Sequence, residues 1–66
     1  ELELHRLIAA APSKNREFHA SDLRRLIGQV AYDRRVLDFM RQFGCAKFAA
    51  TLAVHGQAVV NGEISS

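Results

Sequence analysis

The strongest constraint on the fold is a pair of apolar repeats between residues 18 and 44. Apolar residues recur at positions i, i+3, i+4 and i+7 in each repeat: Leu23, Leu26, Ile27 and Val30, then Val36, Phe39, Met40 and Phe43. This spacing is typical of a helix with one apolar face. The sequence therefore predicts two amphipathic helices joined by a short turn. The first begins at Ser21 and ends near Gly28, and the second runs from about Tyr32 to Gly44.

A third amphipathic segment precedes this pair, at residues 2–11. Its apolar residues have the same helical spacing and are Leu4, Leu7, Ile8 and Ala11. We expect Pro12 to end this helix, because the residue before a proline avoids the helical region. Residues 12–16 are polar apart from the proline and predict a loop.

The last third of the chain allows two interpretations. Thr51, Val54, Val59, Val60 and Ile64 favour strands. We therefore expect a β-hairpin that pairs residues 51–54 with residues 58–61 and turns near His55, Gly56 and Gln57. The alternative is a fourth helix over residues 46–54, because Ala, Lys, Phe and Leu also suit a helix.

Composition limits the size and the chemistry of the domain. The chain has 66 residues, of which 48% are hydrophobic and 24% charged, and this balance argues against disorder. The single cysteine, Cys45, excludes an internal disulfide. His5, His19 and His55 are scattered without the spacing of metal ligands. Because the chain begins with Glu1, we expect residues 1–66 to be one small domain of a larger protein.

A helix, a loop, two consecutive helices and a hairpin form the element order of a winged helix-turn-helix domain. The helix before the turn in that superfamily resembles residues 20–28, with the sequence Ala-Ser-Asp-Leu-Arg-Arg-Leu-Ile-Gly. Its recognition helix resembles residues 32–40, and its wing would be residues 48–64. Val30 and Val36 lie six apart, so the turn would be longer than in the compact motif. The resemblance implies a mainly α domain with three helices and a small β-hairpin.

A second, shorter match resembles the helix-turn-helix of phage repressors. Ala49, Val54 and Val59 are five residues apart, which is the spacing of the buried positions in that motif. This alternative implies an all-α helix-turn-helix bundle of four or five helices.

The winged-helix resemblance implies that a recognition helix at about residues 32–43 binds duplex DNA. The side chains expected to contact DNA are Tyr32, Arg34, Arg35, Arg41 and Gln42, with Arg24 and Arg25 on the preceding helix. Arginine can donate two hydrogen bonds to guanine, and glutamine two to adenine. Lys14 and Arg16 could add contacts to phosphates, which supply much of the affinity of such proteins.

Two aspartates, Asp33 and Asp38, interleave with these arginines, and the net charge is only +2. The alternative function is therefore a protein–protein interaction module with the same fold, and a homodimer is one form of it. Charge topology distinguishes the two functions. Arginines that converge away from the aspartates would favour DNA, and aspartates that stand among them would favour a protein partner. A purely structural role inside an enzyme, as a dimerisation or linker domain, is a third possibility.

Other classes of function find little support in the sequence. There is no glycine-rich phosphate loop, Cys45 has no histidine near it, and so small a domain offers little room for a substrate pocket. We therefore expect no enzyme, no cofactor and no small-molecule substrate. No apolar run approaches the roughly 20 residues of a membrane span, and no signal peptide is evident. An intracellular location, in the cytoplasm or nucleus, is expected.

Overall fold

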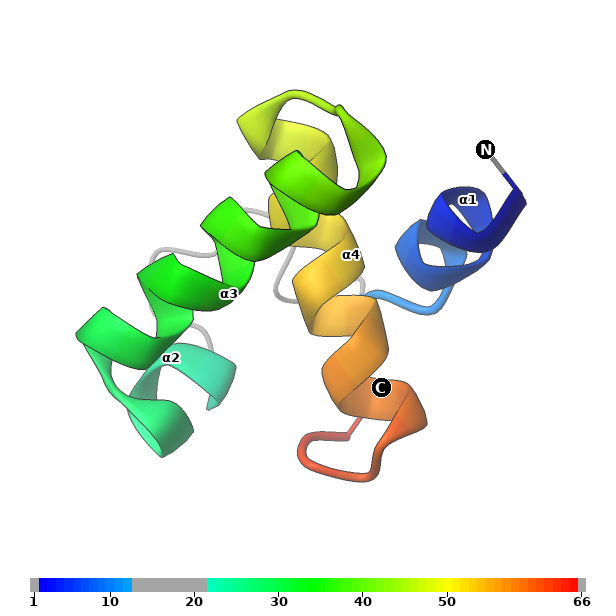
Figure 1. The fold of residues 1–66 in the computed structure, drawn as a ribbon. Coiled ribbons are helices and arrows are strands. Elements are labelled where there is room, and N and C mark those ends of the chain that lie inside the picture. Colours follow the sequence, from blue (N-terminus) through cyan, green and yellow to red (C-terminus); the bar gives the residue numbers. More distant parts are fainter. Residues whose placement is uncertain (1, 13–21, 66) are drawn as a thin grey trace.

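The computed structural model describes residues 2–12 and 22–65, and these residues form four helices (Figure 1). The helices are α1 (Leu2–Ala9), α2 (Asp22–Ile27), α3 (Gln29–Phe43) and α4 (Lys47–Val60). The fourth helix lies between α1 on one side and α3 on the other, and α2 packs beside the N-terminal half of α3. Predictions for Lys14, Arg16, His19 and Ser21 lie outside the described residues.

The predicted β-hairpin is wrong, because α4 runs without a break through both of its expected strands. The described ranges contain no strand at all. Seven residues of α4 are buried: Ala50, Leu52, Ala53, Val54, His55, Gly56 and Ala58. A helix that is buried on most sides has no polar stripe, so its sequence shows no clear helical period. The strand preference of its valines depends on their surroundings, and here packing between two helices prevails.

Gly56, expected in a hairpin turn, instead lies inside α4 where α1 crosses it. A Cβ atom added to Gly56 would stand only 1.6 Å from the backbone carbonyl oxygen of Leu7. No side chain fits in that space, so the close approach of α1 requires glycine at this position. The residue that favours a turn in the sequence is therefore a helix–helix contact in the fold.

The junction between α2 and α3 also differs from the expected one. Gly28 alone separates the two helices, and α3 begins at Gln29 rather than near Tyr32. Gly28 has φ 89° and ψ 159°, a conformation that is essentially restricted to glycine. Its carbonyl oxygen accepts a hydrogen bond from the backbone N–H of Tyr32 at 3.0 Å. The longer turn expected for a winged helix is therefore absent.

Neither of the two predicted fold classes describes this structure. The three-helix winged domain is wrong because its hairpin is replaced by α4. The alternative, an all-α bundle, agrees with the structure in its secondary structure, because the described ranges contain helices and no strand. Its proposed helix-turn-helix is nevertheless wrong, because α4 continues without a turn from Ala49 to Val59.

The apolar faces predicted for α1 and α3 are confirmed. Leu4 and Leu7 are buried on α1, and Val36 is buried on α3. The first repeat is only partly right. Leu23 is fully buried, but Leu26 and Val30 are 60% and 79% exposed. The chain changes direction at Gly28, so residues on the two sides of this glycine no longer share one helical face.

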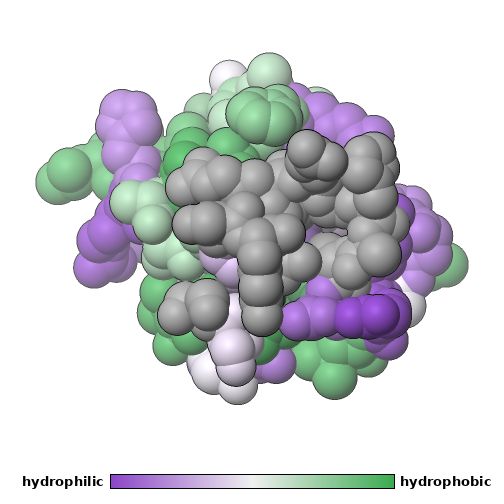
Figure 2. Space-filling view, turned by 180° about the vertical axis from the view of Figure 1, so that it is seen from behind, coloured by the Kyte–Doolittle hydropathy of each residue, from purple (hydrophilic) through white to green (hydrophobic). Residues whose placement is uncertain are grey.

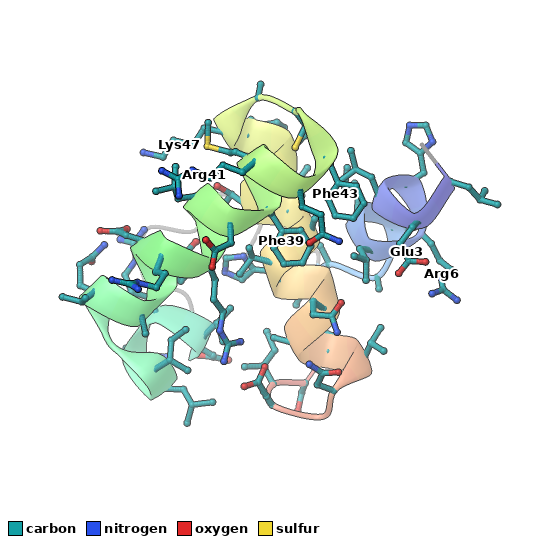
Figure 3. The ribbon with its side chains drawn as sticks, in the orientation of Figure 1. Glu3, Arg6, Phe39, Arg41, Phe43 and Lys47 are labelled. Atoms are coloured by element: carbon teal, nitrogen blue, oxygen red, sulfur yellow. The ribbon has the colours of Figure 1, made fainter. Side chains whose placement is uncertain are left out.

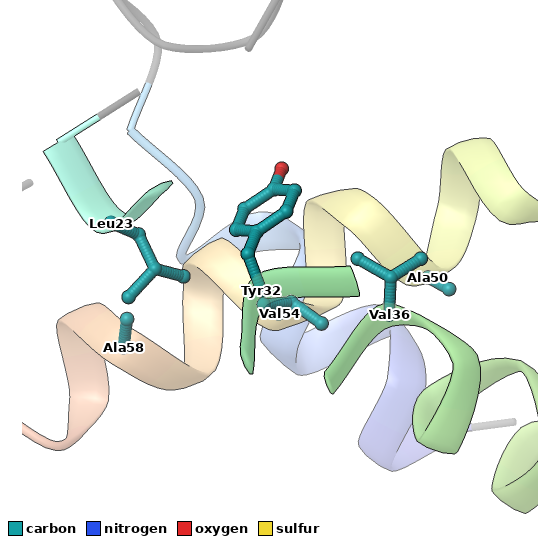
Figure 4. Packing of buried hydrophobic residues seen from close by; sticks show 6 residues of the cluster. All are labelled: Leu23, Tyr32, Val36, Ala50, Val54 and Ala58. Carbon is teal, nitrogen blue, oxygen red and sulfur yellow. The ribbon is translucent and has the colours of Figure 1, made fainter. Parts of the chain in front are cut away.

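The main core joins α2, α3 and α4 (Figure 4). It consists of Leu23, Tyr32, Val36, Ala50, Val54 and Ala58. A second cluster joins α1 to α4 and is covered by two rings from α3. Phe39 and Phe43 stack with their ring centroids 5.6 Å apart and lie on the side of α3 that faces α1 (Figure 3). The three buried alanines of α4, which are Ala50, Ala53 and Ala58, let its neighbours pack closely against it.

The residues after α4 fold back and fasten its end to α3. Gly62, with φ 78°, and Glu63 donate backbone hydrogen bonds to the carbonyls of Val59 and Ala58, which is the Schellman pattern of a helix end. The turn brings Glu63 to Arg35 on α3, and two hydrogen bonds of 2.8 and 3.0 Å join the guanidinium to the carboxylate. This arrangement orients α3 and leaves its opposite side exposed.

Candidate functional site

The structure places Tyr32 in the core rather than on a DNA-binding surface. Its side chain is only 2% exposed. The ring meets the ring of His55 edge to face, with centroids 5.5 Å apart, and the guanidinium of Arg24 lies 4.7 Å from the Tyr32 ring centroid. A contact between Tyr32 and a phosphate would require this packing to open, so the expected role of Tyr32 does not fit its position.

Two of the arginines that were expected to bind DNA form ion pairs within the chain. Arg35 pairs with Glu63, and Arg25 pairs with Asp22 one turn earlier on α2 at 2.5 Å. The hydrogen bonds between Arg35 and Glu63 raise the pKa of the guanidinium and lower the pKa of the carboxyl group. Arg35 therefore stabilises the junction between α3 and the end of α4.

The remaining candidates lie on the exposed side of α3. We call six of its residues the outer face: Val30, Asp33, Arg34, Leu37, Asp38 and Arg41. They line a shallow groove of about 380 Å³, and all six are exposed. Gln42 is exposed but does not line this groove. Figure 3 shows Arg41 projecting from the side of α3 away from α1.

The charges of the outer face balance one another. Two carboxylates, Asp33 and Asp38, stand with two guanidiniums, Arg34 and Arg41, so the net charge is zero. Asp33 accepts a hydrogen bond of 2.8 Å from the neutral side chain of Gln29. Within residues 2–12 and 22–65, none of the four outer-face charges takes part in an ion pair. These four charges are therefore available to a binding partner.

Apolar side chains accompany these charges. Val30 is 79% exposed and Leu37 is 43% exposed, and Leu26 on α2 adds a further exposed apolar side chain. Interfaces between proteins combine an apolar centre with a polar rim. Seen from behind, Figure 2 shows hydrophilic residues in several separate places with hydrophobic ones between them.

A second hollow lies between α3 and the N-terminal part of α4. It is an open groove of about 480 Å³. Its apolar lining includes Val36 and Met40, and its cations are Arg24 and Lys47. Leu37 and Asp33 line this groove as well as the outer face, so the two hollows meet along α3.

His55 has unusual electrostatics, and the sequence did not predict its burial. Its side chain is fully buried in α4, and its Nδ1 lies 2.8 Å from the carbonyl oxygen of Thr51. Burial lowers its pKa, the bond to Thr51 opposes that change, and the charge of Arg24 adds to it. Because no periodic signal marks α4, only the tertiary structure reveals this environment.

The described residues contain no cluster of three or more His, Cys, Asp or Glu side chains that could hold a metal ion. Cys45 is free and partly buried, with its Sγ 4.0 Å from the carbonyl oxygen of Phe39. Across the part of the chain that the structure describes, no helix has the length and apolar character needed to cross a membrane. Comparisons with protein-family models, curated proteins and solved structures find no match to this chain.

Proposed function

We propose that this domain is a protein–protein interaction module whose binding surface is the outer face of α3. The observation that carries the proposal is the position of the charges. Asp33 and Asp38 stand among Arg34 and Arg41 in one groove, which is the topology expected for a protein partner. A surface with charges of both signs can orient a partner through complementary pairs.

The same observation argues against duplex DNA. Affinity for DNA depends on cations that neutralise several phosphates. Of the five arginines expected to bind DNA, three contact groups within the chain, namely Arg24, Arg25 and Arg35. The other two share their surface with two carboxylates, which would repel phosphates. These positions argue against a DNA-binding surface made by the arginines of α2 and α3.

The apolar residues of the outer face support a contact with a helix or a hydrophobic groove. Val30 and Leu37 lie seven residues apart on α3, so they lie on one side of the helix. Amphipathic helices bind partners through residues with such spacing. Apolar contact would supply affinity, and the flanking charges would select the partner and its orientation.

Site-specific photo-crosslinking tests the proposal. In cells that produce the protein, a photoreactive amino acid replaces Leu37 in the outer face. As a control, it replaces the exposed His5 on α1. We expect a discrete protein adduct from position 37 and not from position 5. The purified partner should then bind the domain, and Leu37→Asp should weaken that binding about tenfold or more, since a charge would replace an apolar contact. The matched change His5→Asp should leave it unchanged.

Two results would contradict the proposal. One is that both positions give the same set of adducts, or that Leu37→Asp does not change the affinity for the partner. The other is tight binding to a fluorescent random duplex that falls steeply with salt and is lost in Arg34→Ala and Arg41→Ala, because that would mark the surface as a DNA-binding one. The intracellular location expected from the sequence stays a prediction.

A further inference from the structure

We infer that the partner of the outer face is a second copy of this chain, bound antiparallel through α3 about a two-fold axis near Leu37. This inference rests on the proposed function and names the partner for the same surface. A two-fold interface brings one surface against itself, so the surface must be complementary to its own reversed copy. The charge order along α3 meets this condition.

The complementarity follows from the positions of the four charges. Asp33 and Arg41 lie equally far from Leu37 along α3, in opposite directions. An axis at Leu37 therefore brings Asp33 of one copy opposite the partner's Arg41, and the reverse pair forms by symmetry. These positions lie within about 40° of Leu37 around the helix, since each residue turns the chain by about 100°.

The other two charges pair in the same arrangement. Arg34 lies three residues before Leu37 and Asp38 one residue after it, so Arg34 and the partner's Asp38 are offset by about 3 Å along the helix axis. The long, flexible side chain of Arg34 can cover that difference and reach the partner's Asp38. Four intermolecular ion pairs then surround a central contact between the two Leu37 side chains. In a parallel, in-register arrangement each charge would instead meet a like charge.

The state of these charges in the single chain supports the same conclusion. On α1, the exposed Arg6 and Glu3 pair with each other at 2.8 Å. On the outer face, Arg34 precedes Asp38 by four residues, which is the less favourable order for a pair within a helix. Among the residues that the structure describes, Arg34 makes no such pair. Its guanidinium can therefore turn to a partner without breaking an ion pair.

The size of the surface sets the expected strength. One helix against one helix buries less than the roughly 1,200 Å² of a standard interface, so the dimer should be weak. Its ion pairs are exposed, so added salt should weaken it further. We expect a dissociation constant in the range of tens to hundreds of micromolar.

Sedimentation equilibrium with charge-reversed variants tests the inference. The chain is compared with Asp33→Arg, with Arg41→Asp and with an equimolar mixture of the two, from about 10 μM to about 1 mM at low salt, a range that spans the expected dissociation constant. In a dimer of two Asp33→Arg chains, two cations would face each other at each end of the interface. In a dimer of two Arg41→Asp chains, two anions would face each other there. In the mixture, both opposite-charge pairs return, so the two variants should associate with each other.

The expected result is a dimer for the unmodified chain, about tenfold or more weaker self-association for each variant, and recovery in the mixture. Circular dichroism of each variant should match that of the unmodified chain, because both changed positions are exposed. Recovery in the mixture excludes loss of folding as the cause.

Three results would overturn the inference. They are a monomer at every concentration, a dimer that survives both reversals, and a mixture that does not associate. If the chain is monomeric but position 37 still crosslinks a different protein, the proposed function holds and only the identity of the partner is wrong. If position 37 crosslinks no protein and no dimer forms, both proposals fail.

Discussion

Gly56 sets the distance between α1 and α4. We predict that Gly56→Ala destabilises the domain by about 1–3 kcal/mol, the usual cost of overpacking, even though alanine favours helices by about 1 kcal/mol. The added methyl would meet the backbone of Leu7, which has no flexible side-chain atom to move aside. Urea denaturation measures the change. Gln57→Ala, at the next position, is the control and should stay within about 0.5 kcal/mol. Equal stability of Gly56→Ala and the unmodified chain would contradict the close approach of α1.

His55 should make the domain sensitive to mild acid. Its pKa is lowered in the folded state, so the folded protein keeps it neutral while the unfolded chain binds a proton below about pH 6.5. Stability is therefore full above that pH and falls as the pH drops toward the folded-state pKa. The loss approaches about 1.4 kcal/mol per pH unit for one proton.

Denaturation curves at about pH 7.5, 6 and 5, which bracket the ordinary histidine pKa, measure this loss. In the variant His55→Gln, the dependence of the free energy of unfolding on pH should largely disappear over this range. The variant His5→Gln, changed at an exposed site, should keep that dependence. If His55→Gln keeps the same dependence of the free energy of unfolding on pH, other groups cause that dependence.

At the scale of the helix, α3 depends on the burial of its inner face. Val36 is 4% exposed and packs with Ala50 and Val54 of α4. We predict that Val36→Asp unfolds the domain, because it buries a charge without a partner at a cost of several kcal/mol, comparable to the whole stability of so small a domain. The far-UV circular dichroism spectrum should lose its helical signal. Ala31→Asp, on the exposed side of α3, should keep it. A folded Val36→Asp variant would disprove the assigned inner face.

Helices with one buried side were predictable from the sequence, and the helix buried on most sides was not. The spacing of Leu4 and Leu7, and of Val36 and Phe39, identified the inner faces of α1 and α3. In α4, the consecutive residues 52–56 are all buried, so no polar stripe marks a helical period and the preference of its valines for strands misled the sequence interpretation. The error at Val30 has a different cause, since the backbone conformation of Gly28 separates α2 from α3.

At the scale of the whole molecule, long-range packing determines which candidate site residues remain available. The sequence identified Arg34 and Arg41 as exposed, because they lie opposite the apolar stripe of α3. It could not show that Arg35 pairs with Glu63, a residue 28 positions away. Nor could it place Tyr32 against His55, since that contact requires α4 to be a helix. These two contacts hold Arg35 and Tyr32 within the domain.

The proposed dimer brings the outer face of α3 in one copy against the same face of a second copy. Amide chemical shifts of the ¹⁵N-labelled domain test it most directly, recorded during dilution from about 1 mM to about 20 μM, a range that spans a weak dimer. We predict that the shifts of Val30, Arg34, Leu37 and Arg41 change with concentration, whereas those of α1 stay constant. In high salt this dependence on concentration should disappear. Shifts that do not depend on concentration, or that change on α1 instead, would contradict a dimer formed through the outer face.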